Sequence, residues 1–162
     1  LKGQEKAPFR QTAMSAFNAW IMVKRLETIE LRVKAQPALA LCIIEALQGH
    51  EKLERVIYPG HQSHPQHALV SSQMSGGGTV LAIDIKGGKN VAFAFLNKIN
   101  VGLISNNLGD SKSIFIHPAT TTHQRLSEVR KIDLGITPGS IRLSVGLEDG
   151  DDLVPDILDA LS

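Results

Sequence analysis

One arginine, Arg142, stands inside a run of otherwise apolar and small residues, Ile-Arg-Leu-Ser-Val-Gly-Leu, near the C-terminal end of the chain. A guanidinium group in such a run needs an anionic partner, because burying an unpaired charge is costly. Arginine binds a carboxylate through two parallel, charge-assisted hydrogen bonds. The structural alternative is an ion pair with a carboxylate of the same chain. The residues therefore predict that Arg142 presents its guanidinium to a carboxylate, either on a ligand or within the protein.

Amides, hydroxyls and imidazoles gather upstream of this arginine. Asn106 and Asn107 precede Leu-Gly-Asp, a sequence typical of a turn whose amides form adaptable hydrogen bonds. Residues 117–123, HPATTTH, follow an apolar strand sequence and include Thr122. Neither histidine of this segment has the Ser/His/Asp spacing or the nucleophile elbow of a hydrolase. The segment therefore gives no support to a hydrolase.

Two other clusters have structural interpretations that we favour. His61, His64 and His67 form H-x2-H-x2-H, and three imidazoles could bind zinc. Prolines and a glycine bracket them without a cysteine or carboxylate beside them, so we favour a surface loop over a zinc-binding module. The glycines at 76–78 open a strand and no lysine follows them, which predicts a tight turn rather than a phosphate loop. Cys42 lies in an apolar helical pattern, and we expect a core thiol there.

Composition bounds the class of protein. The chain has 162 residues with 43% hydrophobic and 20% charged residues, which is typical of a soluble globular domain. Lys+Arg total 17 against 16 for Asp+Glu, so nucleic acid is not an expected partner. One cysteine excludes an internal disulfide framework. No apolar run approaches the roughly 18 residues that span a bilayer, and no signal sequence is evident. We therefore expect no membrane partner and a cytoplasmic location.

The periodicity of apolar residues places these motifs on an α/β fold. Apolar residues recur at three- and four-residue steps after Ser15, which predicts a helix capped by that serine. Pro37 predicts a kink or a break before a second helical stretch. Pro155 is tolerated best in a first helical turn, so Asp151 or Asp152 is the expected N-cap of the terminal helix. Short strands are expected at 54–58, 79–85, 99–104, 114–117 and 141–145.

Six motifs occur in the order found in one family of pyridoxal-phosphate (PLP) enzymes. They are FNAW-x5-LET-x2-LR at 17–32, YPG-x2-SHPQH at 58–67, GGT at 77–79, NNLGD-x-KS at 106–113, HPATTTHQRLS at 117–127 and TPG-x2-RLSVGLED at 137–149. Each motif alone is weak, but six in the right order are specific. The chain resembles the C-terminal part of the Cys/Met-metabolism PLP enzymes, the cystathionine γ-synthase family.

The resemblance implies a fold and roles for three residues. The fold is the small C-terminal domain of a fold-type I PLP enzyme, an α+β sandwich with a mostly antiparallel sheet of about four strands. Arg142 would bind the substrate's α-carboxylate, and Thr122 would lie in the loop at the substrate mouth. Asn107 takes the position where many relatives have a serine near that carboxylate. The domains expected are a loose remnant of the cofactor domain at 1–14, a linking helical segment at 15–47, kinked near Pro37, and a small α/β domain at 48–162.

The same departure at Asn107 favours the branch of O-succinylhomoserine sulfhydrylases. The implied reaction is γ-replacement, in which sulfide displaces succinate from the acylated homoserine and gives homocysteine. Cystathionine γ-synthase, O-acetylhomoserine sulfhydrylase and methionine γ-lyase are the alternatives within the family. An alternative of another class is a non-catalytic interaction module, which would expose an apolar face along Phe17, Trp20 and Val23.

The family's cofactor-binding lysine follows a Ser/Thr-rich strand end, upstream of the segment corresponding to FNAW. None of the ten lysines of this chain has that setting, and the chain begins at Leu1. We therefore expect a fragment of roughly the last two-fifths of an enzyme, with no catalytic residue of its own, no bound PLP and no activity alone. The intact parent is expected to bind PLP and O-acylhomoserine, to contain an N-terminal PLP domain and to form a homotetramer.

Overall fold

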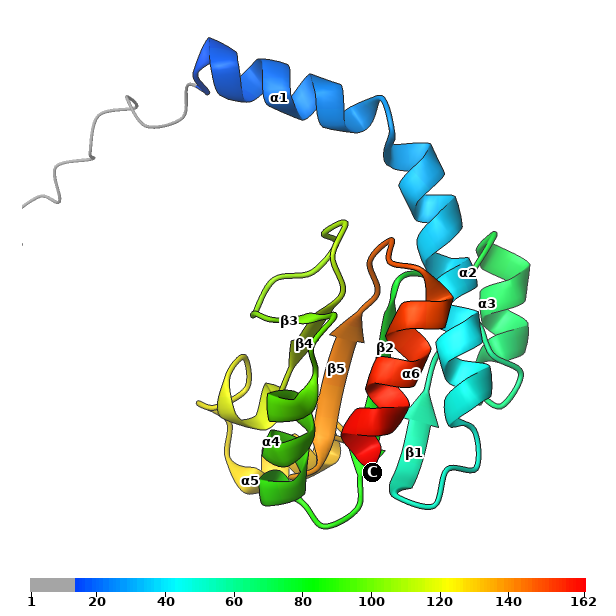
Figure 1. Cartoon of the computed structure of the whole chain (residues 1–162), viewed down its shortest axis with the longest axis vertical. Coiled ribbons are helices and arrows are strands. Elements are labelled where there is room, and N and C mark those ends of the chain that lie inside the picture. The colour runs from blue at the N-terminus through cyan, green and yellow to red at the C-terminus, as the bar shows by residue number, and fades with distance from the viewer. Residues whose placement is uncertain (1–13) are drawn as a thin grey trace, which may run out of the picture. The chain divides into compact units, whose positions relative to one another are not determined.

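A computed structural model describes residues 14–162, so the expectation of a loose segment at 1–14 lies almost wholly outside the described residues. The chain divides into two compact units, Leu1–Leu31 and Arg32–Ser162. Figure 1 shows one helix of the first unit, and a sheet flanked by helices in the second. Within residues 14–162, no helix has both the length and the apolar character that crossing a membrane requires.

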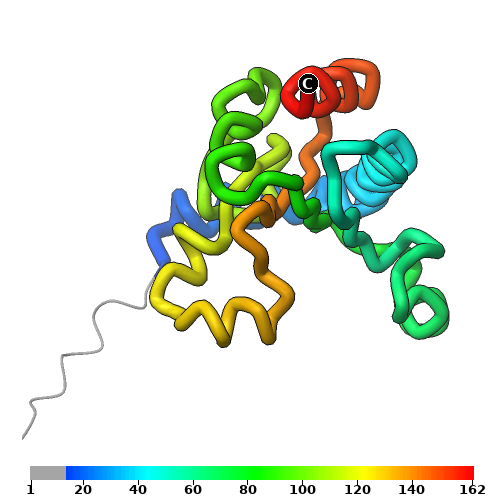
Figure 2. Tube along the Cα trace, turned by 90° about the horizontal axis from the view of Figure 1, so that it is seen from below, coloured from blue at the N-terminus to red at the C-terminus, as the bar shows by residue number. Residues whose placement is uncertain are grey.

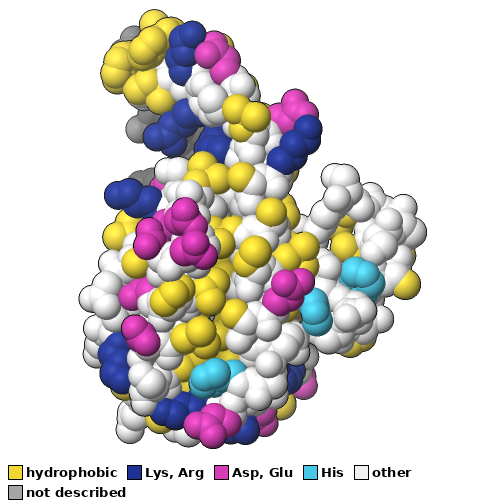
Figure 3. All heavy atoms as spheres, turned by 45° about the vertical axis from the view of Figure 1, so that its right-hand side comes forward, with side chains coloured by type: hydrophobic (Ala, Val, Ile, Leu, Met, Phe, Trp, Pro, Cys, Tyr) yellow, Lys and Arg dark blue, Asp and Glu magenta, His cyan; other side chains and the backbone are white. Residues whose placement is uncertain are grey.

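The first unit contains α1, Ala16–Leu26. Ser15 caps this helix as expected, since its Oγ accepts a hydrogen bond from the amide of Asn18 at 3.2 Å. No residue of α1 is buried, and its large apolar side chains are exposed. Phe17 and Trp20 are 66% and 57% exposed and stack on each other with ring centroids 6.2 Å apart. Hydrophobic side chains accordingly gather on the surface of this helix (Figure 3).

The second helix, α2 (Ile29–Leu47), runs through Pro37. The helical interruption falls earlier, at the Glu27–Thr28 turn, so a break at Pro37 is wrong, whereas the kink named as its alternative stays a prediction. A proline removes one amide donor from a helix but leaves the neighbouring hydrogen bonds available. Burial of the following turns stabilises the helix there, because Leu39, Ala40 and Ile43 all enter the core.

Five strands form the sheet in the order β1-β2-β5-β4-β3. Every pair is antiparallel except β3 and β4, which are parallel. The expected sheet of about four mostly antiparallel strands is therefore roughly right. The strands are β1 (Leu53–Ile57), β2 (Val80–Ile85), β3 (Leu103–Ile104), β4 (Ile114–Ile116) and β5 (Ser140–Ser144).

Three helices cover one face of the sheet, as the view along the strands shows (Figure 2). They are α2, α4 (Lys89–Lys98) and α6 (Gly150–Leu161). We call this the helical face. Alternate strand residues point into it and form the core with the helices, among them Leu81, Ile83, Phe115, Ile141 and Leu143. The strongly amphipathic α6 contributes Leu153 and Ile157 to the same core.

The other residues of the strands point to the opposite face, which we call the open face. Residues 118–139 lie on this side at one end of the sheet (Figure 2). They include a 3-10 turn, η1 (Pro118–Thr120), and α5 (Glu128–Asp133). The short α3 (His67–Gln73) follows the histidine loop.

Two local expectations are wrong. The N-cap of α6 is Asp149, whose Oδ1 accepts from the amide of Asp151 at 3.0 Å, rather than Asp151 or Asp152. Pro155 then stands beyond the first turn, at the start of the helix's second. Cys42 is exposed on α2 instead of buried, because the buried stripe of the helix runs through Leu39, Ile43 and Leu47.

Candidate carboxylate-binding site

Arg142 stands in the middle of β5 and points to the open face. Its neighbours Ile141 and Leu143 enter the core, at 0% and 2% exposure, so the side chain between them must point the other way. Across the sheet, Arg142 pairs with Ala82 of β2 on one side and with Ile116 of β4 on the other. A central strand thus holds the base of the arginine, and the side chain is only partly exposed.

The guanidinium of Arg142 is incompletely bonded. Its Nη2 donates to the carbonyl oxygen of Asn107 at 3.0 Å and approaches that of Asn106 at 3.4 Å. Its Nε is buried, and no residue of the described range 14–162 accepts a hydrogen bond from it. The ion pairs found between described residues do not include Arg142, so the carboxylate of the same chain considered from the sequence is not observed. A buried charged donor without a partner is uncommon and favours a ligand at this point.

The two carbonyls that contact Arg142 belong to the loop of residues 105–110, which is hydrogen-bonded to β5 and to α2. The amide of Gly109 donates to Ser144 Oγ at 2.9 Å. Gln36 of α2, only 4% exposed, donates from Nε2 to the carbonyls of Asp110 and Val145, both at 2.8 Å. Asn107 takes part in this arrangement through its backbone carbonyl, which accepts the hydrogen bond from Arg142. Gln36 was missed from the sequence, although an amide within an apolar helical stretch is a usable signal.

The HPATTTH segment is anchored through its first histidine. His117 is 3% exposed, and its Nε2 lies 2.9 Å from the carbonyl of Pro138 while its Nδ1 lies 2.8 Å from Thr120 Oγ1. Thr121 Oγ1 donates to the carbonyl of His117 at 2.7 Å. Thr122 is exposed, and its hydroxyl pairs with His123 Nδ1 at 2.8 Å. The described hydrogen bonds therefore do not bring Thr122 to Arg142.

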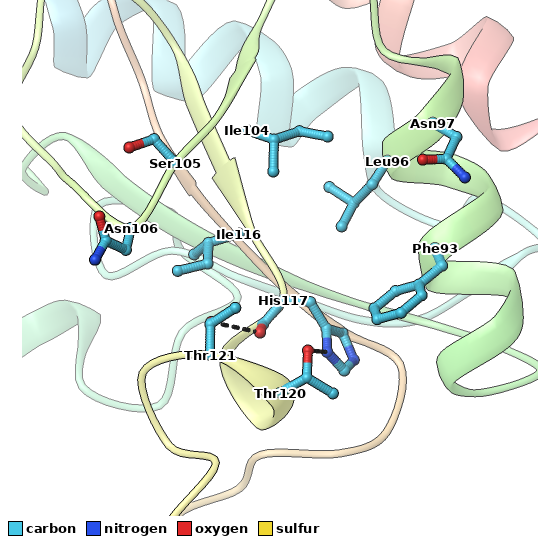
Figure 4. Close-up of a pocket in the computed structure, with 10 residues that line it drawn as sticks. All are labelled: Phe93, Leu96, Asn97, Ile104, Ser105, Asn106, Ile116, His117, Thr120 and Thr121. Carbon is cyan, nitrogen blue, oxygen red and sulfur yellow. Dashed lines mark hydrogen bonds between the residues drawn. The ribbon is translucent and has the colours of Figure 1, made fainter.

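A cavity of about 310 Å³ opens beside this segment (Figure 4). Its walls are mainly apolar, and its rim includes Ser105, Asn106 and Thr121. Asn106 thus lines the cavity, and its carbonyl oxygen also approaches Arg142. Arg142 does not line the cavity, so the two sites are neighbours that share the 105–110 loop.

A second charged cluster occupies the open face near the start of β5. Asp84 of β2 is 1% exposed and pairs with Arg55 of β1, whose Nε donates to Oδ2 at 2.6 Å. Ser140 Oγ and Thr137 Oγ1 donate to Oδ1 at 2.5 and 3.2 Å. This cluster was not predicted from the sequence, although Asp84 within the apolar strand 80–85 was a signal for it.

The three histidines of the 61–67 loop are bonded separately. His61 Nδ1 lies 2.8 Å from Ser63 Oγ, and His64 Nδ1 accepts from the amide of Gln66. His67 Nε2 lies 3.3 Å from Ser71 Oγ. In the part of the chain that the structure describes, no group of three or more His, Cys, Asp or Glu side chains is placed to hold a metal ion.

The side chains present fit a carboxylate and do not fit PLP. The cofactor would need a lysine, an anion for its ring nitrogen and a cradle for its phosphate. The described hydrogen bonds of Arg142 reach neither a lysine nor a carboxylate. The glycine turn at 76–78 packs against Gly60 in the loop before α3. Tyr58 Oη also donates to the carbonyl of Gly78 at 2.8 Å. Among the described residues, the guanidinium of Arg142 is therefore a candidate group for binding a carboxylate.

Comparison with protein families identifies the family of the chain. Residues 9–162 match the family model of the Cys/Met metabolism PLP-dependent enzymes. The chain belongs to this family. Its order of motifs was therefore interpreted correctly, and PLP is the cofactor on which the family depends.

Curated relatives of this family member include O-succinylhomoserine sulfhydrylases. The protein from Mycobacterium tuberculosis is 49% identical over 154 residues, which cover 93% of this chain and 38% of the relative. The protein from Pseudomonas aeruginosa is 44% identical over 162 residues, 98% of this chain and 40% of the relative. An O-acetyl-L-homoserine sulfhydrylase from Leptospira meyeri is 41% identical. The chain thus spans about two-fifths of the length of the curated relatives it matches.

Solved structures agree with the fold. A putative O-acetylhomoserine (thiol)-lyase from Campylobacter jejuni, which contains a pyridoxyl-lysine monophosphate, superposes with a TM-score of 0.89 at 34% identity, covering 94% of this chain and 37% of that one. Cystathionine γ-synthase from Xanthomonas oryzae superposes with a TM-score of 0.85 at 32% identity, covering 91% and 38%. The sheet and its helices therefore have the fold of the matching part of these PLP enzymes.

Proposed function

We propose that this chain is the substrate-carboxylate-binding part of a PLP-dependent O-succinylhomoserine sulfhydrylase, in which sulfide replaces succinate and yields homocysteine. The observation that carries the proposal is the buried Nε of Arg142, which has no partner beside an Nη2 already held by Asn107. Identities of 49% and 44% to two such sulfhydrylases support the choice of reaction.

In this proposal Arg142 performs binding and orientation. A carboxylate reaching the open face would accept from Nε and from a free Nη hydrogen, which is the paired geometry that arginine prefers. The two carbonyls of the 105–110 loop hold the guanidinium in place before the ligand arrives. Fixing the α-carboxylate at two points restricts rotation of the substrate's Cα, so that its reacting bonds keep one orientation. Asn107 contributes through its carbonyl, and Thr122 is proposed to complete the mouth of the site.

The proposed partners follow from the family and from the share of the relatives' length that the chain spans. We propose an N-terminal PLP domain, an O-acylhomoserine substrate, a homotetrameric parent and a cytoplasmic location. Residues 15–47 would link the N-terminal domain to the small domain at 48–162. The exposed apolar residues of α1 support a partner for this helix, since solvent-exposed aromatic pairs mark contact surfaces. This chain alone would hold no PLP and have no activity.

A domain exchange tests the reaction directly. This chain replaces the aligned C-terminal segment of the Pseudomonas aeruginosa relative, and homocysteine formation from sulfide is measured with O-succinyl- and O-acetyl-L-homoserine. We expect turnover with a preference for the succinyl ester. A preference for the acetyl ester would place the chain in the O-acetylhomoserine branch. A correctly folded chimera that binds PLP and turns over neither ester would support the alternative of a non-catalytic module.

The role of Arg142 is tested in the same chimera by Arg142→Lys. The lysine keeps the positive charge but loses the two-point hydrogen-bond geometry. We expect KM for the amino-acid substrate to rise by about ten- to a hundredfold, the loss typical of one charged hydrogen-bonded partner. An unchanged KM would exclude Arg142 as the carboxylate-binding residue.

A further inference from the structure

Two arginines and one buried carboxylate share the open face of the sheet. In the antiparallel register, Asp84 of β2 pairs with Ser140, and Ala82 pairs with Arg142. Asp84 and Arg142 are therefore diagonal neighbours on the same face. Such neighbours lie about 7–8 Å apart at their Cα atoms, within the reach of a long side chain. Asp84 is the nearest carboxylate along the sheet that could capture the unpartnered Nε of Arg142.

Asp84 is saturated by other donors. Its Oδ2 accepts a hydrogen bond from Arg55 Nε and forms an ion-pair contact with Arg55 Nη2, and its Oδ1 accepts from Ser140 and Thr137. These four interactions use the roughly four lone-pair positions of a carboxylate. Two of the four come from Arg55, which is also the source of the only positive charge among them. Arg55 Nη2 additionally donates to the carbonyl of Gly135 at 2.9 Å, which fixes the orientation of its guanidinium.

We propose that Arg55 is a positioning residue for the carboxylate site: by neutralising and occupying Asp84, it keeps the guanidinium of Arg142 open to a ligand. This inference rests on the proposed role of Arg142. Without Arg55, Oδ2 of Asp84 would be a buried, ionised oxygen that had lost both its donors. Leaving it so is costly, and the Nε of Arg142 supplies a donor and a charge at once. Arg142 would then turn toward Asp84 and compete against the ligand's carboxylate.

The test uses the full 162-residue chain and the Nε–Hε signals of its arginines in ¹⁵N–¹H spectra. The Arg142 signal is assigned as the one lost in Arg142→Lys. Acetate is the probe, acetamide is the uncharged control of the same shape, and sodium chloride keeps the ionic strength constant. We expect acetate, but not acetamide, to shift the Arg142 signal of the unmodified chain.

Three variants then separate positioning from stability. Arg55→Met is expected to shift the Arg142 signal without acetate and to weaken the acetate response by about tenfold, or about 1.4 kcal/mol. Arg55→Lys keeps a charge on Asp84 and should retain most of the response. The double variant Arg55→Met/Asp84→Asn removes the competing charge and should restore the response, although it lacks the ion pair altogether. A merely structural ion pair would leave the double variant no better than Arg55→Met.

The outcomes distinguish this inference from the proposed function. If acetate leaves the Arg142 signal of the unmodified chain unmoved, the carboxylate role of Arg142 fails and the inference fails with it. If that signal responds equally in the unmodified chain and in Arg55→Met, the role of Arg142 stands and that of Arg55 is overturned. Should Arg55→Met fail to fold, Asp84→Asn decides the question. With the competing charge gone, its acetate response must equal or exceed that of the unmodified chain, and a weaker one would overturn the inference.

Discussion

The two faces of the sheet carry different kinds of side chain, although the same strands form both. On the helical face, the side chains are apolar and interlock with α2, α4 and α6. On the open face, β2 and β5 present polar side chains: Arg142 and Ser144 are bonded to the 105–110 loop, and Asp84 is bonded to Ser140 and to Arg55 of β1. Adjacent residues of β5 therefore make different contributions to stability and binding. Ile141 contributes to the stability of the fold, whereas Arg142 leaves a buried donor unsatisfied, which reduces stability and favours a ligand.

The largest effect is expected from the helical face. Ile141→Ala removes a side chain of 0% exposure from the centre of the core and leaves a cavity. We expect the free energy of unfolding to fall by about 2–5 kcal/mol, measured by urea denaturation. Ile132→Ala in α5 is the matched control, because Ile132 is 73% exposed, and its effect should stay within about 0.5 kcal/mol. Equal losses in both variants would contradict the division between the faces.

Arg142→Met sharpens the comparison from the adjacent position. The methionine fills part of the space of the arginine stem and removes the buried Nε that lacks a partner. We expect the free energy of unfolding to change by less than about 1 kcal/mol, in either direction. A loss as large as that of Ile141→Ala would show that Arg142 is a structural residue instead of a binding one.

What the sequence could reveal also differs between the faces. The helical face was predictable, because the 3.6- and 2-residue periods of apolar residues report burial directly. Arg142 stood out for the opposite reason, as a charge within such a pattern. The partners of Arg142 were not predictable in detail, since they are backbone carbonyls of a loop. Gln36 and Asp84 were missed because their donors and acceptors are distant along the chain, and only the folded register brings them together.

After Ile141→Ala, the next-largest loss of stability is expected from the hydrogen bonds of Gln36. Gln36→Leu keeps the volume of the side chain but removes two buried hydrogen bonds, to the carbonyls of Asp110 and Val145. We expect a loss of about 1–3 kcal/mol in the free energy of unfolding. The 105–110 loop should loosen as well, which faster amide exchange of Gly109 would report. Exposed Gln73→Leu in α3 is the control and should change neither quantity. Unaltered exchange at Gly109 would mean that Ser144 holds the loop without Gln36.

Tyr58 links the strand β1 to the glycine turn before β2. Its hydroxyl donates to the carbonyl of Gly78 at 2.8 Å, and burial raises the pKa of the phenol above its usual value of 10.0. The neutral form is thus favoured in the folded state. Stability is fully present below the unfolded pKa and declines as the pH rises above about 10 toward the folded pKa. Tyr58→Phe should cost about 1 kcal/mol at neutral pH and lessen this alkaline decline. Denaturation at several pH values measures this alkaline decline in stability. A decline of the same size in Tyr58→Phe would show that other groups cause it.

A loss similar to that of Tyr58→Phe is expected at the N-terminus of α6, where this helix of the core begins. Asp149→Ala removes the side chain that caps the amide of Asp151, and we expect a loss of about 1 kcal/mol in the free energy of unfolding. Asp151→Ala removes a carboxylate that only interacts with the helix dipole, at a cost of about 0.3–1 kcal/mol that salt should screen. Denaturation at low and high salt separates the two. A larger, salt-independent loss in Asp151→Ala would instead show that Asp151 is the N-cap, as the position of Pro155 suggests from the sequence. The first turn of α6 would then begin after Asp151.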